Sequence, residues 1–127
     1  MIHGNGNSTV QLLPGETLSC RGSNDCTSLV VSVVGDVNWT TSGKLRARIN
    51  ELLTVDHPAR IILDLKDVAR IDSSGIGVLL GGLREASKKS VRFTLSGLRD
   101  APRRLLERTH LNMLFDIHPT VDEALHA

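Results

Sequence analysis

Aromatic side chains are scarce in this sequence, which has one Trp, two Phe and no Tyr. Leu, Val, Ile and Ala must therefore fill the core, and a surface of stacked aromatic rings for single-stranded nucleic acid is not expected. An excess of one charge is also missing, because 15 Lys and Arg stand against 14 Asp and Glu, for a formal net charge of +1. No broad positive field is available to gather phosphates. These two deficits exclude direct nucleic-acid binding from the expected functions.

Long apolar runs and cysteine-rich segments are absent as well. No stretch approaches the ~18 apolar residues that a membrane span requires, and no basic start followed by an apolar run marks an export signal. Cys20 and Cys26 are too few for a thiolate zinc site or a disulfide framework, so free thiols are expected. The five histidines show no metal-ligand spacing. The sequence therefore predicts a cytoplasmic protein with no metal, no cofactor and no membrane partner.

The length of 127 residues suits a single domain, in which residues 1–15 are polar, aperiodic and expected to be flexible. From there on, short β-branched or aliphatic runs alternate with apolar residues at helical spacing. A short edge strand is expected at 16–20, the apolar runs lie at 29–34, 60–65, 91–95 and 114–117, and helices are expected at 40–53, at 73–89, from 100 and after 120. Alternation of this kind needs crossover connections, which make the pairing largely parallel. The fold class is therefore α/β.

A polar segment at residues 71–77, Ile-Asp-Ser-Ser-Gly-Ile-Gly, stands where a helix is expected to begin. One interpretation is structural, since Asp and Ser side chains cap a helix and glycines permit close packing. The other is functional, because free N–H groups and the positive end of the helix dipole stabilise an anion there. A phosphate on Ser73 would bring about −1.5 to −2 charges beside Asp72 and would repel an acidic partner. The residues alone leave both interpretations open.

Residues 64–80 resemble the signature of STAS domains, and in particular of the phosphorylatable anti-sigma-factor antagonists. The resemblance centres on Asp-Ser-Ser-Gly at 72–75 and extends over about residues 28–126. It implies a mostly parallel sheet of four to five strands, with about four helices packed chiefly on one side. It also implies that Ser73 accepts a phosphate from an anti-sigma factor that is itself an ATP-dependent serine kinase, with Ser74 as the minor alternative.

Partner switching is the function that this resemblance implies. The unphosphorylated chain binds the kinase and frees the sigma factor, the phosphorylated chain is released, and a separate serine phosphatase resets the switch. The protein is then a regulator and a substrate, a monomer by default and not an enzyme. The residues expected to bind the partner are Asp72, Ser73, Ser74, Gly75, Gly77 and Asn38. The two glycines are expected to let the kinase approach the backbone closely.

Two features depart from the family pattern. Asn38 stands where the family commonly has Asp, and the segment before residue 28 is longer and contains both cysteines. An alternative function also stays open, in which the domain is a constitutive binding or scaffold module of a stress-signalling or transport complex, without phosphoryl transfer. A dinucleotide site is disfavoured by the spacing of the glycines after Ser73. A serine hydrolase is disfavoured because Ser73 lacks the Gly-x-Ser-x-Gly frame.

Overall fold

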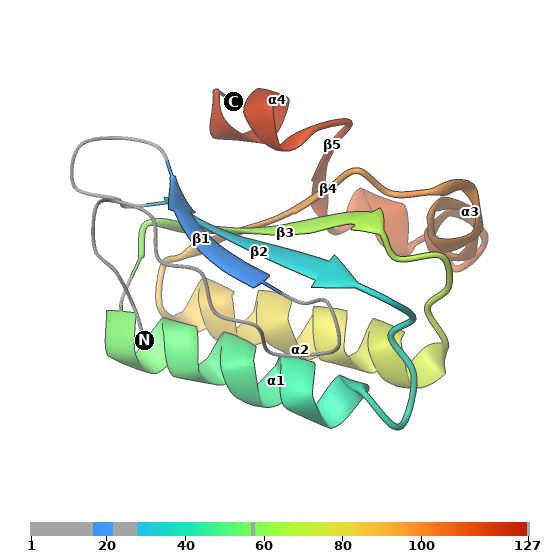
Figure 1. The fold of residues 1–127 in the computed structure, drawn as a ribbon, viewed down its shortest axis with the longest axis horizontal. Coiled ribbons are helices and arrows are strands. Elements are labelled where there is room, and N and C mark those ends of the chain that lie inside the picture. The colour runs from blue at the N-terminus through green and yellow to red at the C-terminus, as the bar shows by residue number, and fades with distance from the viewer. Residues whose placement is uncertain (1–16, 22–27, 57, 127) are drawn as a thin grey trace.

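The protein is described here by a computed structural model, which covers residues 17–21, 28–56 and 58–126. Within these residues, five strands form one sheet in the order β1-β2-β3-β4-β5 (Figure 1). The strands are β1 (Thr17–Arg21), β2 (Ser28–Val34), β3 (Arg60–Asp67), β4 (Arg92–Ser96) and β5 (Asp116–His118). β1 pairs antiparallel with β2, and every later pair is parallel. The predicted α/β class and mostly parallel sheet are confirmed.

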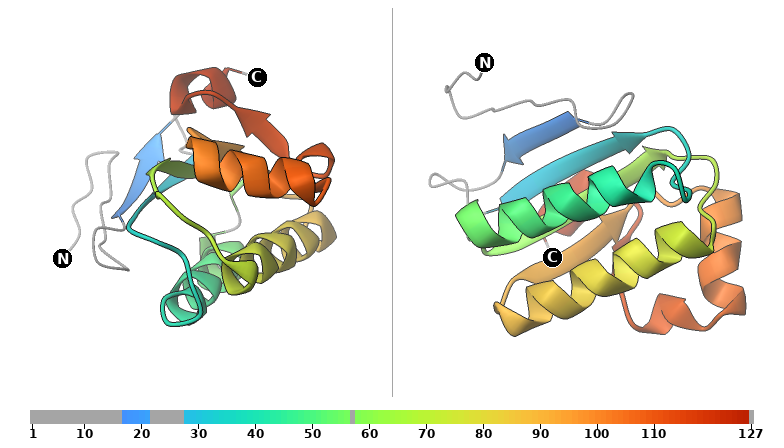
Figure 2. Two further views of the ribbon diagram at one scale, coloured as in Figure 1. Left: turned by 90° about the vertical axis from the view of Figure 1, so that its right-hand side faces the viewer. Right: turned by 90° about the horizontal axis from the view of Figure 1, so that it is seen from below.

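Helices cover both faces of this sheet, unequally. They are α1 (Ser42–Glu51), α2 (Ser73–Lys88), α3 (Asp100–Arg108) and α4 (Val121–Leu125). A π-helical turn at Leu52–Asp56 continues α1, and a 3-10 turn at Leu111–Met113 follows α3. α1 and α2 lie side by side on one face, α3 lies beyond the arrowheads of the parallel strands, and the short α4 lies on the opposite face (Figure 1, Figure 2). The expectation that helices pack chiefly on one side is confirmed, with α4 as the element on the other.

The two faces are built by alternation along the central strands. Val31 of β2 and Ile61 of β3 belong to the main core under α1 and α2, whereas Val30 and Ile62, their neighbours in the chain, join Ala124 in a smaller cluster under α4. Successive side chains of a strand point to opposite faces, so a continuous apolar run needs cover on both sides. This requirement explains why the chain returns across the sheet after β5 to place α4.

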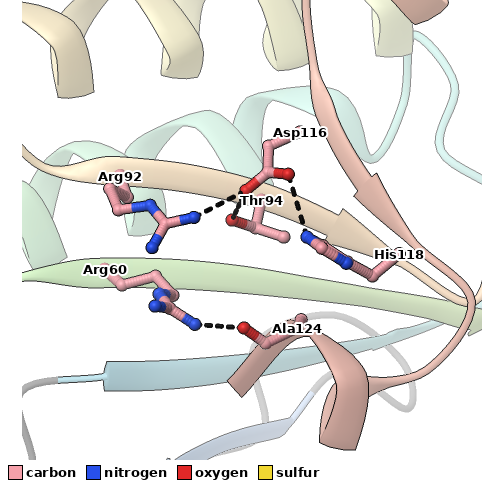
Figure 3. A network of polar contacts seen from close by, with 6 residues as sticks. All are labelled: Arg60, Arg92, Thr94, Asp116, His118 and Ala124. Atoms are coloured by element: carbon pink, nitrogen blue, oxygen red, sulfur yellow. Dashed lines mark hydrogen bonds and ion pairs between the residues drawn. The ribbon is translucent and has the colours of Figure 1, made fainter. Parts of the chain in front are cut away.

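A capped start and one arginine hold α4 in place. The hydroxyl of Thr120 accepts a hydrogen bond from the N–H of Glu123 at 3.1 Å, as expected from their spacing. At the other end, the guanidinium of Arg60 donates to the carbonyl oxygen of Ala124 (Figure 3). A side chain of the central strand β3 thus closes the last turn of the C-terminal helix.

Asp116 is the centre of a polar network on the same face (Figure 3). Its carboxylate accepts a hydrogen bond from the buried hydroxyl of Thr94 at 3.1 Å and pairs with Arg92 at 3.1 Å and His118 at 2.9 Å. Burial alone would raise the pKa of Asp116, but the hydrogen bond from Thr94 and the charge and hydrogen bonds of His118 and Arg92 together lower it below its ordinary value. This network ties the short edge strand β5 to β4.

Some sequence-based expectations fall on other parts of the chain. Residues 1–15, Cys26, the turn at 23–25 and His57 lie outside the described residues, and so does the side chain of Cys20. The expected flexibility of the N-terminal segment and the expected free thiols therefore stay predictions.

Candidate functional site

The first turn of α2 is organised by Asp72. Helix α2 begins at Ser73, and Asp72 precedes it with an extended backbone, as an N-cap residue does. Its Oδ1 accepts a hydrogen bond from the N–H of Gly75 at 3.0 Å, and its carbonyl oxygen accepts one from the N–H of Ile76 at 2.9 Å. The predicted cap and helix start are therefore both present.

Ser73 is exposed at this helix start, and Ser74 is half-buried. Within the described part of the chain, no hydrogen bond engages the hydroxyl or the N–H of Ser73, or the N–H of Ser74. The first N–H groups of a helix have no partner inside the helix and point toward its entrance. Ser73 thus combines an accessible hydroxyl with free donors and the positive end of a helix of 16 residues.

Gly75 and Gly77, for which the sequence predicts the same role, differ in their burial. Gly75 is buried, and a Cβ built on it would lie 2.5 Å from Cγ2 of Ile71 and 2.8 Å from the carbonyl oxygen of Val37. Gly77 is exposed, and a Cβ there would meet nothing within 4 Å. Gly75 therefore serves the close packing of α2 on the neighbouring loop, and its contact with a partner stays a prediction. Gly77 lies on the open side of the helix.

The loop between β2 and α1, residues 35–41, lies against the start of α2. The N–H of Val37 donates to the carbonyl oxygen of Arg70 at 3.1 Å, and the carbonyl oxygen of Val37 accepts from the N–H of Asp72 at 3.1 Å. The N–H of Trp39 donates to Oδ2 of Asp72 at 3.2 Å. These bonds join the two loops that follow the neighbouring parallel strands β2 and β3, and so fix the position of one loop relative to the other.

Asn38 shapes this loop from within. Its Oδ1 accepts hydrogen bonds from the N–H and the hydroxyl of Thr40, at 2.9 and 2.6 Å, and from the N–H of Thr41 at 3.3 Å. An Asp side chain has an acceptor oxygen at the same place, so the departure from the family pattern removes a charge and keeps these bonds. Asn38 is half-buried, and its contact with a partner stays a prediction.

Trp39 is the feature of this site that sequence reasoning missed. This residue is 77% exposed, although Trp is highly buried on average in proteins. Beside it the two loops enclose a shallow hollow of about 280 Å³, lined by Asp36, Val37, Asn38, Arg70, Ile71 and Asp72. The one signal in the sequence is a lone Trp within a polar segment, which does not distinguish an exposed indole from a buried one.

Three other features are absent from the described residues: a metal site, a histidine bonded to Ser73 and a membrane-spanning helix. No group of three or more His, Cys, Asp and Glu in that part of the chain could hold a metal ion. Of the described histidines, none forms a hydrogen bond with Ser73: His118 pairs with Asp116 on the α4 face, and His126 bonds the carbonyl of Asp122. Among the same residues, no helix has the length and apolar content that crossing a bilayer demands.

Comparison with known proteins identifies the family. The family model described as the STAS domain matches residues 18–124, so the chain belongs to the STAS domain family. The anti-sigma F factor antagonist of Paenibacillus polymyxa is 29% identical over 99 residues, which cover 78% of this chain and 82% of that protein. The anti-sigma-B factor antagonist of Listeria monocytogenes is 28% identical over 93 residues, with 73% and 81% covered.

A solved structure agrees with these relatives. The crystal structure of an anti-sigma factor antagonist from Mycobacterium paratuberculosis superposes with a TM-score of 0.74 at 26% identity, covering 92% of this chain and 97% of that one. The resemblance to STAS domains, and to anti-sigma factor antagonists among them, is confirmed. The family is a regulatory one.

Proposed function

We propose that this protein is an anti-sigma-factor antagonist that binds an anti-sigma kinase when Ser73 is unmodified and is released when Ser73 is phosphorylated. The observation that carries the proposal is the exposed hydroxyl of Ser73 at the capped start of α2, beside N–H groups with no partner among the described residues. The names of the relatives, anti-sigma F and anti-sigma-B factor antagonists, support the same function.

The free N–H groups make a phosphate tolerable to the protein itself. A phosphate at the N-terminus of a helix gains hydrogen bonds and a favourable interaction with the helix dipole. The same group adds about −1.5 to −2 charges next to the carboxylate of Asp72, and both charges would then have to be desolvated in any close interface. Phosphorylation of Ser73 therefore disrupts docking while leaving the fold intact.

The proposed docking surface consists of Trp39, Ser73, Ser74 and Gly77. Exposed aromatic residues of this kind are frequent energetic centres of protein interfaces, and Gly77 offers no side chain to hold a partner away from α2. Asp72 lies beside Ser73 and fixes the geometry of both loops. Gly75 and Asn38 contribute from beneath, by packing and by shaping the loop.

Phosphorylation with a candidate anti-sigma kinase from the same organism tests the proposal directly. Wild type, Ser73→Ala and Ser74→Ala are each incubated with the kinase and ATP, and the modified residue is mapped by mass spectrometry. We expect one phosphate on wild type and on Ser74→Ala, and none on Ser73→Ala. Calorimetry should show that Ser73→Ala still binds the kinase. A serine phosphatase that removes the phosphate should restore binding.

The same experiment distinguishes the proposed switch from the alternative function. A constitutive STAS binding or scaffold module would bind its partner stably, would take up no phosphate from ATP, and would show the same affinity for wild type and Ser73→Glu. In the proposed switch, Ser73→Glu binds the kinase more weakly than wild type, although one carboxylate imitates a phosphate only in part.

A further inference from the structure

A groove runs between α1 and α2 on the side of the helical layer that faces away from the sheet. Its volume is about 330 Å³, and it lies along the C-terminal halves of the two helices. Buried apolar side chains form its floor, among them Ile49, Leu53 and Val78. Exposed cations line its sides: Arg46, Arg84 and Lys89.

Glycines keep this groove open. A Cβ on Gly81 would meet nothing within 4 Å, so no side chain from this position fills the space. A Cβ on Gly82 would lie 2.8 Å from the ring of Phe93, which shows how tightly α2 sits on the sheet beneath. The groove is therefore shallow, preformed and bounded by long cationic side chains.

The charge of the groove is unbalanced. Among the described residues, Arg46, Arg84 and Lys89 have no ion-pair partner, and the lining carboxylate, Glu85, is paired with Lys88 at 3.2 Å. Residues 42–51 and 73–89 carry six Lys and Arg against two Glu, an excess of four positive charges, whereas the net charge of the whole chain is +1. Cations near a helix C-terminus complement the helix dipole, but Arg46 lies in the middle of α1.

The groove is within reach of a partner that contacts Ser73. Residues 73, 77 and 81 follow one another at intervals of four and so share one side of α2. Eight residues at 1.5 Å each place Gly81 about 12 Å from Ser73 along the helix.

This distance of about 12 Å exceeds the Debye length of about 8 Å at physiological ionic strength, so a phosphate on Ser73 has little direct effect on charges at the groove.

We infer that the α1–α2 groove is a second docking surface, which takes an acidic, amphipathic segment of the same anti-sigma partner. The inference rests on the proposed function for the identity of that partner. Carboxylates of the segment would pair with Arg46, Arg84 and Lys89, and an apolar side chain would lie over Gly81. The contact would persist after phosphorylation, so the modified chain would keep a weak, salt-sensitive affinity for the kinase.

A peptide titration tests the groove without the kinase. The probe is a blocked 16-residue peptide made of four Leu-Glu-Glu-Leu repeats, and its control replaces every Glu by Lys. With ¹⁵N-labelled protein, the acidic peptide should shift the amide signals of Asn50, Gly81 and Gly82, and the basic peptide should not. Arg46→Glu/Arg84→Glu should lose these shifts, and the matched variant on α3, Arg103→Glu/Arg104→Glu, should keep them. No shift at Gly81, or equal shifts with inorganic pyrophosphate at the same ionic strength, overturns the inference.

Binding to the kinase then distinguishes the two proposals. We expect Arg46→Glu/Arg84→Glu to bind the kinase at least tenfold more weakly than wild type and still to be phosphorylated on Ser73 at high protein concentration. If the double variant binds the kinase as tightly as wild type, the groove is not a docking surface, although the switch at Ser73 stands. If the wild type neither binds nor accepts phosphate, the proposed function fails, and the peptide titration still decides the chemistry of the groove.

Discussion

The carboxylate of Asp72 holds the backbone of Trp39. Oδ2 of Asp72 accepts the hydrogen bond from the N–H of Trp39 at 3.2 Å, across 33 residues of sequence, while Oδ1 caps α2 through the N–H of Gly75 at 3.0 Å. One side chain therefore positions both the proposed phosphorylation site and the exposed indole. Since the two oxygens have different partners, their contributions can be separated by substitution.

Asp72→Ala should lower the free energy of unfolding by about 1–2 kcal/mol, because it removes the cap of α2 and the link to the loop of Trp39. Asp72→Asn should cost less, since its amide oxygen can still accept from Gly75 and Asn is as good a cap as Asp. Urea unfolding followed by far-UV circular dichroism measures both. Equal stability of Asp72→Ala and wild type would show that the cap contributes nothing.

Gly75→Ala and Gly77→Ala form a matched pair in the same helical turn. Ala is favoured over Gly in a helix interior by about 1 kcal/mol, and at exposed Gly77 this gain should appear as increased stability. At Gly75 the added Cβ would lie 2.5 Å from Ile71, and the overpacking should cost about 1–3 kcal/mol and outweigh the gain. The same unfolding measurement compares them, and a stabilising Gly75→Ala would contradict the close packing of α2 on Ile71 and Val37.

Trp39→Ala tests whether the indole is part of the docking surface. Because Trp39 is 77% exposed, the change in unfolding free energy should stay within about 0.5 kcal/mol. The affinity for the anti-sigma kinase should fall by about 2 kcal/mol or more, as at other interface hot spots. Calorimetry with Trp39→Phe as a partial replacement gives the comparison. Unchanged affinity for Trp39→Ala would place the interface away from the β2–α1 loop.

The helix start at Ser73 was predictable because its signals are local. Asp72 is a good cap, the glycines and serines follow it, and the apolar side chains of α2 recur at helical spacing. The same holds for α4, where the spacing of Thr120 and Glu123 indicates the cap. The apolar run at 114–117 was less informative: Leu114 is 58% exposed, Phe115 is buried, and the strand there, β5, begins only at Asp116.

The features of the site that could not be predicted from the sequence depend on contacts between distant segments. The burial of Gly75 follows from its packing against Val37, and the backbone of Trp39 is held by a hydrogen bond to Asp72, neither of which is encoded within one window of sequence. The groove between α1 and α2 has the same origin. In the sequence, Arg46 and Arg84 are two separate, solvated side chains. Only the packing of α1 against α2 brings them to the same groove.

Stability at low pH should depend on Asp116. Its pKa is lower in the folded protein than its ordinary value, so its contribution is present above the pKa of the unfolded chain, about 3.9, and is lost as the pH falls through the lower, folded value. Asp116→Asn removes the charge that pairs with Arg92 and His118. Because the Asp116 side chain is 40% exposed and its ion pairs are screened, we expect a loss of about 0.5–1 kcal/mol at neutral pH.

This difference between Asp116→Asn and wild type should shrink as the pH falls from about 5 toward about 3, because the wild-type carboxylate becomes protonated in the unfolded chain and then in the folded one. Urea unfolding at a series of pH values measures it. Thr94→Val provides the internal comparison, because it removes a hydrogen bond that lowers the pKa of Asp116 in the folded protein. The folded and unfolded pKa values should then lie closer together, so the pH range over which the stability changes should become narrower. A difference that stayed constant down to about pH 3 would mean that the Asp116→Asn variant loses only packing or hydrogen bonding, and that the charge of Asp116 contributes nothing to the stability of the β4–β5 edge.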